Sequence, residues 1–304
     1  MKHRRVIPAL VAGSIGAFVV VALRRGGARR LDGDWPVNFA HRGASARAPE
    51  NTLEAFRLAA EDGAGGLETD VHVMRDGHVV AIHDDTVDRT TDGSGLVRET
   101  TLADLQSLDA GYRFTPDGGA TYPYRGKGVR VPELREVLRE FPGLAVNVDI
   151  KEARPGAEEA VLRVIEGAGA QDRTLVVSEH TPVVGRFRRL SGGRVRTGAS
   201  RGESRLFYYL SGLRLEGLLR PAYDALQVPV RHGERELVTP RFLEAAHGAG
   251  VRVDVWTIDE PAEMRRLLDL GVDVVMTNRP EALAGVLRGR GLYTLANDEH
   301  GREK

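Results

Sequence analysis

The sequence contains no cysteine, and this absence removes several kinds of chemistry. Disulfide bonds, zinc sites with thiolate ligands and cysteine nucleophiles are all excluded. Basic and acidic residues number 43 each, and no basic cluster in the body of the chain predicts binding to nucleic acid. Aromatic residues make up only 6%. We therefore expect any chemistry to come from carboxylate, imidazole and cationic side chains.

Long hydrophobic runs are also lacking, except near the N-terminus. Residues 6–23 carry no charge, and eighteen helical residues rise about 27 Å, close to the hydrocarbon thickness of a bilayer. We expect residues 1–30 to form an uncleaved membrane anchor and residues 31–35 a linker. A cleaved export signal and a buried soluble helix are the alternatives. Basic residues flank both ends of the run, so they do not indicate on which side of the membrane the protein lies.

From residue 36 to residue 288, short apolar runs alternate with amphipathic segments. The predicted strands span residues 37–40, 144–150, 174–177, 195–199, 225–230, 251–257 and 272–276. The predicted helices span residues 52–62, 158–168, 182–190, 240–249, 261–270 and 281–288. This alternation predicts an α/β fold with parallel strands, and seven or eight such units predict one TIM (β/α)8 barrel. An open doubly wound sheet is the alternative, but no strand is followed by a Gly-x-Gly-x-x-Gly turn.

Two parts of the chain interrupt this alternation. Predicted strands at residues 68–74 and 78–83 are too close for a parallel crossover, so they form a hairpin. A two-residue turn at its tip would place Asp70 opposite His83. Residues 85–130 contain no strand-helix unit, which predicts an insertion over one end of the barrel. Residues 289–304 form a polar tail.

Carboxylates are spaced along two of the predicted strands. Glu68 and Asp70 lie on one face about 7 Å apart, a spacing of hard oxygen ligands that suits magnesium or calcium. A solvated strand edge is the alternative. Asp149 stands near the strand end at which barrel active sites form, and it can complete the ligand set. Lys151, one of only four lysines, would reach a substrate anion, unless it forms an internal salt bridge with Asp149.

A histidine and an arginine follow the first predicted strand. Arg42 offers a planar pair of donors that matches phosphate oxygens. His41 and His83 approach from neighbouring strands and have pKa values naturally near neutrality, so they form a candidate acid–base pair. A divalent cation, two imidazoles and two cationic side chains around one point predict cleavage of a phosphodiester.

Four further residues are candidates for supporting roles. Glu50 is a candidate residue of the phosphate-binding site, where it could orient Arg42 or a histidine. Asn51 or Thr52 caps the helix that follows. Trp256, at the end of its strand, is predicted to wall the pocket and to pack on a glycerol or choline group, with packing at the barrel rim as the alternative.

Several segments resemble, in order, the signature segments of the glycerophosphodiester phosphodiesterase family, in the PLC-like phosphodiesterase superfamily. They are HRGASARAPENTLEAF, LETDVHVMRDGHVVAIHDDTVDRTTDGSG, NVDIK, VDVWTID and VDVVMTNRP, between residues 37 and 280. The resemblance implies a TIM barrel that hydrolyses glycerophosphodiesters, such as glycerophosphocholine, to glycerol 3-phosphate and an alcohol.

The resemblance also implies roles for individual residues. It places the catalytic histidines at His41 and His83, and the ligands of one divalent cation, Ca²⁺ or Mg²⁺, at Glu68, Asp70 and Asp149. The family's usual third ligand is glutamate, so the shorter Asp149 departs from its pattern. We expect His41 to act as the base and His83 as the acid.

Two other functions compete with this one. A phospholipase D-like activity on lysophospholipids would use the same residues, and a membrane anchor would suit a lipid substrate. The Pro-Glu-Asn-Thr segment favours the glycerophosphodiesterases. An inactive, membrane-tethered binding module is the other alternative, although the chain lacks none of the implied catalytic groups. The sequence leaves the headgroup and the oligomeric state open.

Overall fold

The computed structural model describes residue 35 and residues 37–292. The predicted membrane anchor at residues 1–30, most of the linker and most of the polar tail lie outside the described residues. In the part of the chain that is described, no helix has the length and apolar character needed to span a bilayer.

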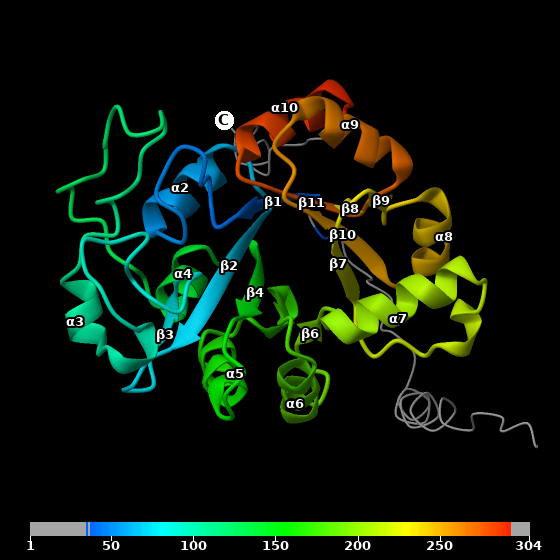
Figure 1. Ribbon diagram of the computed structural model, residues 1–304, viewed down its shortest axis with the longest axis horizontal. Coiled ribbons are helices and arrows are strands. Elements are labelled where there is room, and N and C mark those ends of the chain that lie inside the picture. Colours follow the sequence, from blue (N-terminus) through cyan, green and yellow to red (C-terminus); the bar gives the residue numbers. More distant parts are fainter. Residues whose placement is uncertain (1–34, 36, 293–304) are drawn as a thin grey trace, which may run out of the picture.

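Eight parallel strands form a ring at the centre of the molecule (Figure 1). They are β1 (Asn38–His41), β2 (Gly66–Val73), β4 (Ala145–Ile150), β5 (Thr174–Val177), β6 (Arg196–Thr197), β7 (Ala225–Pro229), β10 (Arg252–Trp256) and β11 (Val274–Thr277). Neighbouring strands follow the order β6-β5-β4-β2-β1-β11-β10-β7. A parallel bridge between Gly198 and Ala225 joins the two ends of this order, so the barrel is nearly closed.

A helix follows each strand of the ring and covers its outer side (Figure 1). These helices are α2 (Leu53–Glu61), α4 (Leu134–Glu140), α5 (Ala157–Gly167), α6 (Thr181–Ser191), α7 (Arg201–Gly212), α8 (Pro240–Gly248), α9 (Pro261–Leu270) and α10 (Pro280–Gly289). Each strand-helix unit buries apolar side chains between the helix and the ring, as Phe56 and Ala59 of α2 do. The predicted barrel architecture is confirmed.

Helices α4 and α7 were not among the predicted helices. Only Phe207 and Ser211 of α7 are buried, so the helix offers few apolar positions that face the core. The helix begins instead at a capping box: the Ser200 hydroxyl accepts from the Glu203 amide, and the Glu203 carboxylate accepts from the Ser200 amide.

The predicted hairpin is present, but its register differs by one residue from the predicted register. In β3 (Val79–Ala81), Ala81 pairs with Val71 of β2. Gly77 has a φ of 86°, which fits a three-residue loop rather than the two-residue turn. The predicted pairing of Asp70 with His83 is therefore wrong, because the Ile82 amide donates to the Asp70 carbonyl.

Six short elements complete the described chain. The insertion between β3 and α4 contains η1 (Val97–Glu99) and α3 (Leu102–Gln106), which pack with the β2–β3 hairpin around a small apolar cluster. A hairpin of β8 (Arg231–His232) and β9 (Arg235–Glu236) follows β7, and single turns η2 (Gln171–Arg173) and η3 (Glu216–Leu218) precede β5 and β7.

Trp35 closes the end of the barrel at which the strands begin. Its ring stacks on Phe39, with centroids 5.9 Å apart. The guanidinium groups of Arg252 and Arg196, the first residues of β10 and β6, lie 4.4 and 5.2 Å from the Trp35 ring. Arg252 also donates to the buried carboxylate of Asp254. The floor of the barrel is thus sealed, and the opposite end forms its mouth.

Candidate active site

The register of the parallel strands brings the predicted residues together at the mouth of the barrel. His41, the last residue of β1, lies beside Glu68 on β2. Asp70, two residues further along β2, lies beside Asp149 on β4. Glu68 and Asp70 are almost completely buried, although both carry carboxyl groups. Such side chains are tolerated in a barrel only where other groups compensate their charge.

His41 is held by the side-chain amide of Asn278, the residue that follows β11. Its Nδ1 lies 2.8 Å from Oδ1 of Asn278, and the Asn278 amide nitrogen donates to Asp259 at 2.7 Å. This second bond turns Oδ1 toward the ring, and an amide oxygen only accepts, so Nδ1 of His41 carries the proton. Burial lowers the pKa of His41, against the opposite effect of the Asn278 bond. Neutral His41 thus presents an unprotonated Nε2, which lies 3.9 Å from Glu68.

His83 is held by the residue that follows it. Its Nδ1 lies 2.6 Å from Oδ1 of Asp84. Hydrogen bonds, first from Arg89 and then from His83, lower the pKa of Asp84 to about 2. Asp84 therefore stays ionised and accepts the proton of His83 Nδ1, which fixes the orientation of the ring. The His83 side chain is one third exposed. His83 also lowers the pKa of Asp70 and of Asp149, so it lies at the same mouth as these carboxylates.

Arg42 lies between two carboxylates and has a φ of 57°, in the left-handed region. Its backbone amide is hydrogen-bonded to Glu68, and its Nη1 donates to Glu50 at 3.1 Å. Nε lies 2.9 Å from Asp70 but is not aligned for a hydrogen bond. The next residue, Gly43, passes so close to α2 that a Cβ would come within 2.7 Å of Ala55. This tight turn holds the guanidinium at the mouth.

Arg89 is a member of the site that the sequence analysis did not single out. It donates to both oxygens of Glu50 at 2.7 Å, and its Nε donates to Asp84 at 2.6 Å. One guanidinium from the insertion therefore joins Asp84, which holds His83, to Glu50, which holds Arg42. Glu50 contacts both Arg42 and Arg89. The only feature of the sequence that pointed to Arg89 was its position in the segment HDDTVDRTT.

Lys151 lies between Asp70 and Asp149. Its Nζ is 2.7 Å from Oδ1 of Asp70 and 2.7 Å from Oδ2 of Asp149. Although burial opposes this, the two negative charges raise the pKa of Lys151, so the ammonium stays protonated. Burial alone would raise the pKa of Asp70, but Lys151 and Arg42 hold it below its ordinary value. The internal salt bridge with Asp149, the alternative for Lys151, is present.

Negative charge exceeds positive charge in this buried cluster. Glu68, Asp70 and Asp149 face the two cations Arg42 and Lys151. Burial and the neighbouring charge of Asp70 raise the pKa of Glu68 well above its ordinary value. Burial also raises the pKa of Asp149, whose Oδ1 is buried without a hydrogen-bond partner among the described residues. The cluster therefore has the donor chemistry and the charge to take up a further cation.

The three carboxylates nevertheless do not form a ready-made metal site. Within residues 37–292, no three carboxylate or histidine side chains are arranged to share one ion. Lys151 explains this for two of the predicted ligands, because its ammonium stands between Asp70 and Asp149.

The sequence left open whether Asn51 or Thr52 caps α2, and the structure gives the two residues different roles. Thr52 caps α2 by accepting from the Ala55 amide at 3.2 Å. Asn51 donates from its side-chain amide to Asp70 at 3.0 Å and accepts from the Thr69 hydroxyl. Asn51 thus orients the Asp70 carboxylate.

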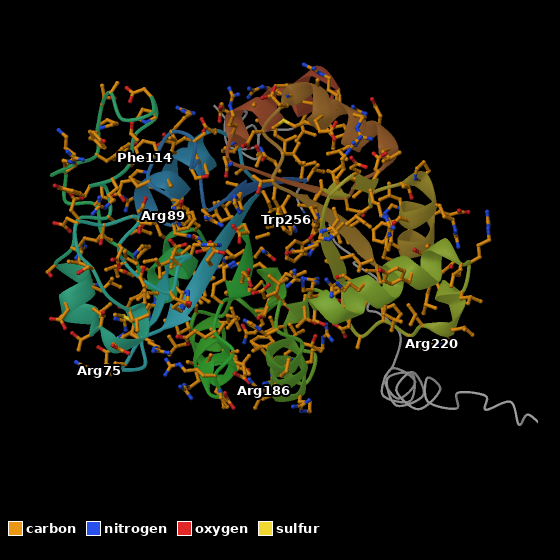
Figure 2. All side chains as sticks on the ribbon, viewed as in Figure 1. Arg75, Arg89, Phe114, Arg186, Arg220 and Trp256 are labelled. Carbon is orange, nitrogen blue, oxygen red and sulfur yellow. The ribbon has the colours of Figure 1, made fainter. Side chains whose placement is uncertain are left out.

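Trp256 ends β10 at the mouth and is 43% exposed. It projects near the centre of the ring of strands, whereas Arg89 lies at the inserted segment (Figure 2). This exposure at a strand end differs from that of a core tryptophan and leaves the indole accessible to a ligand.

A comparison with known families places the chain. Residues 41–282 match the model of the Glycerophosphoryl diester phosphodiesterase family. The chain belongs to this family. The match confirms the family predicted from the motifs and, with it, the predicted class of enzyme, a phosphoric diester hydrolase.

Two relatives match this chain over nearly their whole length. A glycerophosphodiester phosphodiesterase of Caldanaerobacter subterraneus is 35% identical over 83% of this chain and 98% of the relative. A probable glycerophosphodiester phosphodiesterase 2 of Mycobacterium tuberculosis is 34% identical over 91% of this chain and 97% of the relative.

Solved structures give the same result for the fold. A glycerophosphoryl diester phosphodiesterase domain from Mycobacterium tuberculosis superposes with a TM-score of 0.72 over 84% of this chain and 100% of that domain, at 23% identity. An Oleispira antarctica phosphodiesterase, solved in complex with the product sn-glycerol-3-phosphate, superposes with a TM-score of 0.65 at 27% identity, over 84% of this chain and 97% of that one.

Proposed function

We propose that the protein hydrolyses glycerophosphodiesters to glycerol 3-phosphate and an alcohol. One observation carries this proposal: His41 and His83 are each held through Nδ1 at one barrel mouth, beside Arg42 and Lys151. The named relatives and the product in the Oleispira antarctica structure support the substrate class.

The two histidines divide the proton transfers. Neutral His41, with Nε2 unprotonated, accepts the proton of the attacking hydroxyl or water. His83, paired with the ionised Asp84, gives a proton to the oxygen of the leaving alcohol.

Arg42 and Lys151 stabilise the phosphoryl group as negative charge builds up on its oxygens. Arg42 has a planar guanidinium, which donates to Glu50, and Arg89 in turn donates to Glu50. Trp256 packs on the glycerol or the headgroup at the mouth. Glu50 therefore contributes to phosphate binding through Arg42 rather than by direct contact.

We also propose that Glu68, Asp70 and Asp149 hold one divalent cation, Ca²⁺ or Mg²⁺. The unpartnered Oδ1 of Asp149 and the raised pKa of Glu68 support this donor set. For all three to share the ion, the Lys151 ammonium must leave the gap between Asp70 and Asp149. A bound cation would polarise a phosphate oxygen and compensate its charge.

The apolar residues 6–23 support a further proposal, that the protein is attached to a membrane by an uncleaved N-terminal segment. Export after cleavage is the competing outcome. Detection of residues 1–23 by mass spectrometry of the protein from a membrane fraction tests the attachment.

The activity is tested with three histidine variants of the full chain. His41→Ala and His83→Ala should each lower kcat on glycerophosphocholine by about 100- to 10,000-fold, the usual contribution of an acid or base. His247→Gln is the matched control, because His247 lies in the last turn of α8 and pairs with Asp273. Wild-type kcat in either alanine variant, with an unchanged melting temperature, would reject the assignment. Release of choline from lysophosphatidylcholine instead of glycerophosphocholine would favour the lipid substrate.

A further inference from the structure

Exposed apolar side chains gather on one stretch of the chain. Eight large hydrophobic side chains are exposed among the described residues, and four of them fall within residues 209–218. Tyr209, Leu213, Leu215 and Leu218 are 61%, 67%, 43% and 64% exposed. Tyr209 lies on α7, and the leucines lie on the turn that ends in η3. Single exposed apolar residues are ordinary, but a cluster of this kind marks an interaction surface.

The same surface carries an excess of positive charge. Arg205, Arg214 and Arg220 are exposed and form no ion pair within 4.0 Å in the described part of the chain, although Arg214 is near enough to Glu216 to lower the pKa of that carboxyl. The nearby carboxylates are already paired, since Glu203 binds Arg188 and Glu216 binds Arg241. We call the four apolar residues and these three arginines the α7–η3 edge. Figure 2 places Arg220 at the outside of the molecule, beyond α7.

The α7–η3 edge lies on the wall of the barrel near its mouth. Figure 1 shows α7 from the side, and α7 packs against α8 and β7. A groove of about 390 Å³ separates α7 from the start of α8, and Tyr209, Leu213, Arg235 and Thr239 contribute to its lining. Arg235 and Thr239 both follow the mouth end of β7, so the groove opens on that side.

We propose that the α7–η3 edge rests on the surface of a bilayer that contains anionic phospholipid. Leucine and tyrosine side chains suit the boundary between headgroups and acyl chains, and arginines that keep their charge in the headgroup layer bind lipid phosphates. The excess of positive charge around the apolar side chains favours an anionic lipid surface over a protein partner, because an apolar contact with a protein does not need it.

The chain outside the described residues fits this occupant. It contains the apolar residues 6–23, joined to Trp35 by residues 24–34, which reach about 40 Å when extended. Trp35 touches the beginnings of β6 and β10, and α7 and α8 cover the strands on this side of the barrel. A membrane-embedded N-terminal segment can therefore hold this wall against the same bilayer, with the mouth opening along the membrane surface.

The absence of cysteine allows a direct test in the full chain. Leu218→Cys, labelled with an environment-sensitive fluorophore, is compared with Ala120→Cys, an exposed position in the insertion. Both are reconstituted in vesicles of phosphatidylcholine and phosphatidylglycerol. We expect lipids brominated in their acyl chains to quench the label at position 218 and to leave the label at position 120 unchanged. Equal emission at the two positions would overturn the proposal.

A second variant separates docking from anchoring. Leu213→Asp with Leu215→Asp, introduced beside the position 218 label, should abolish the quenching while the protein stays with the vesicles. Unchanged quenching would count against the edge. A label that is shielded but not quenched by bromine would mean that protein, and not lipid, covers the edge, which would also overturn the proposal. The covering protein is a second copy if the shielding grows with protein density, and the N-terminal segment if it does not. Hydrolysis of glycerophosphocholine should be unchanged in every variant, which distinguishes this test from that of the proposed function.

Discussion

The carboxylate of Asp84 lies 2.6 Å from Nδ1 of His83, its neighbour in the sequence. Asp84→Asn should lower kcat by about 10- to 100-fold with little change in KM, the rate equivalent of a hydrogen bond to a charged group. Steady-state kinetics with glycerophosphocholine measures both constants. Asp88→Asn is the control, because Asp88 lies on the same loop and caps the Gly95 amide. A rise in KM alone would show that Asp84 serves binding.

Asn278 fixes the tautomer of His41, so its removal should act on the base. Burial lowers the pKa of His41, while the Asn278 bond raises it. His41 works when deprotonated, so activity is lost as the pH falls through its pKa, which lies below 6.5. Asn278→Ala should move this acidic limb of kcat/KM to lower pH and reduce the plateau. An acidic limb that moves to higher pH would contradict the role of this bond.

Lys151 is expected to compete with the cation for Asp70 and Asp149. Lys151→Ala should therefore bind Ca²⁺ or Mg²⁺ more tightly, as measured by calorimetry. At the same time, kcat should fall by about 100- to 1,000-fold, because a positive charge next to the phosphoryl group is lost. Weaker cation binding would show that Lys151 supports the ion instead of displacing it.

Glu68 makes cation binding depend on pH in a defined direction. Its folded-state pKa is raised, so the folded protein holds the proton more tightly than the unfolded chain does. In the metal-free protein, stability therefore falls as the pH rises above about 4.5, the unfolded value. Added cation should raise the melting temperature more at pH 8 than at pH 5, and Glu68→Gln should remove this difference. Equal shifts at both pH values would argue against Glu68 as a ligand.

Arg252 and Asp254, both on β10, form a buried ion pair with side chains 4% and 0% exposed. Arg252→Leu leaves the Asp254 carboxylate buried without its partner and should lower the free energy of unfolding by about 3–5 kcal/mol. Urea denaturation measures this loss. Arg252→Leu combined with Asp254→Leu should recover much of it, and a double variant as unstable as the single one would point to lost packing on Trp35.

Much of the fold could be predicted because its units repeat the same physical pattern. Strands β5 and β11 are nearly continuous apolar runs, which is typical of parallel strands buried on both sides. The hairpin register could not be predicted, since two-residue and three-residue turns both accept the Asp-Gly sequence at the tip. Helix α7 was missed because only Phe207 and Ser211 of its residues are buried, which leaves a short face toward the core.

Those residues of the candidate site that lie near strand ends could be predicted from the sequence. The parallel register that places His41 beside Glu68 follows from the barrel itself. Arg89 and Asn278 could not be found this way, because both act through contacts between segments far apart in the sequence. Lys151 shows a further limit: spacing places an ammonium near two carboxylates, but only coordinates show that it occupies the gap between them.

The tryptophan at residue 35 gives the beginning of the domain a sharp boundary. A shortened protein that starts at residue 37 would lose the Trp35 ring, which packs against Phe39, Arg196 and Arg252. Water would then reach the core through the end of the barrel at which the strands begin. Any natural processing or engineered truncation that preserves the barrel must therefore cut upstream of this side chain.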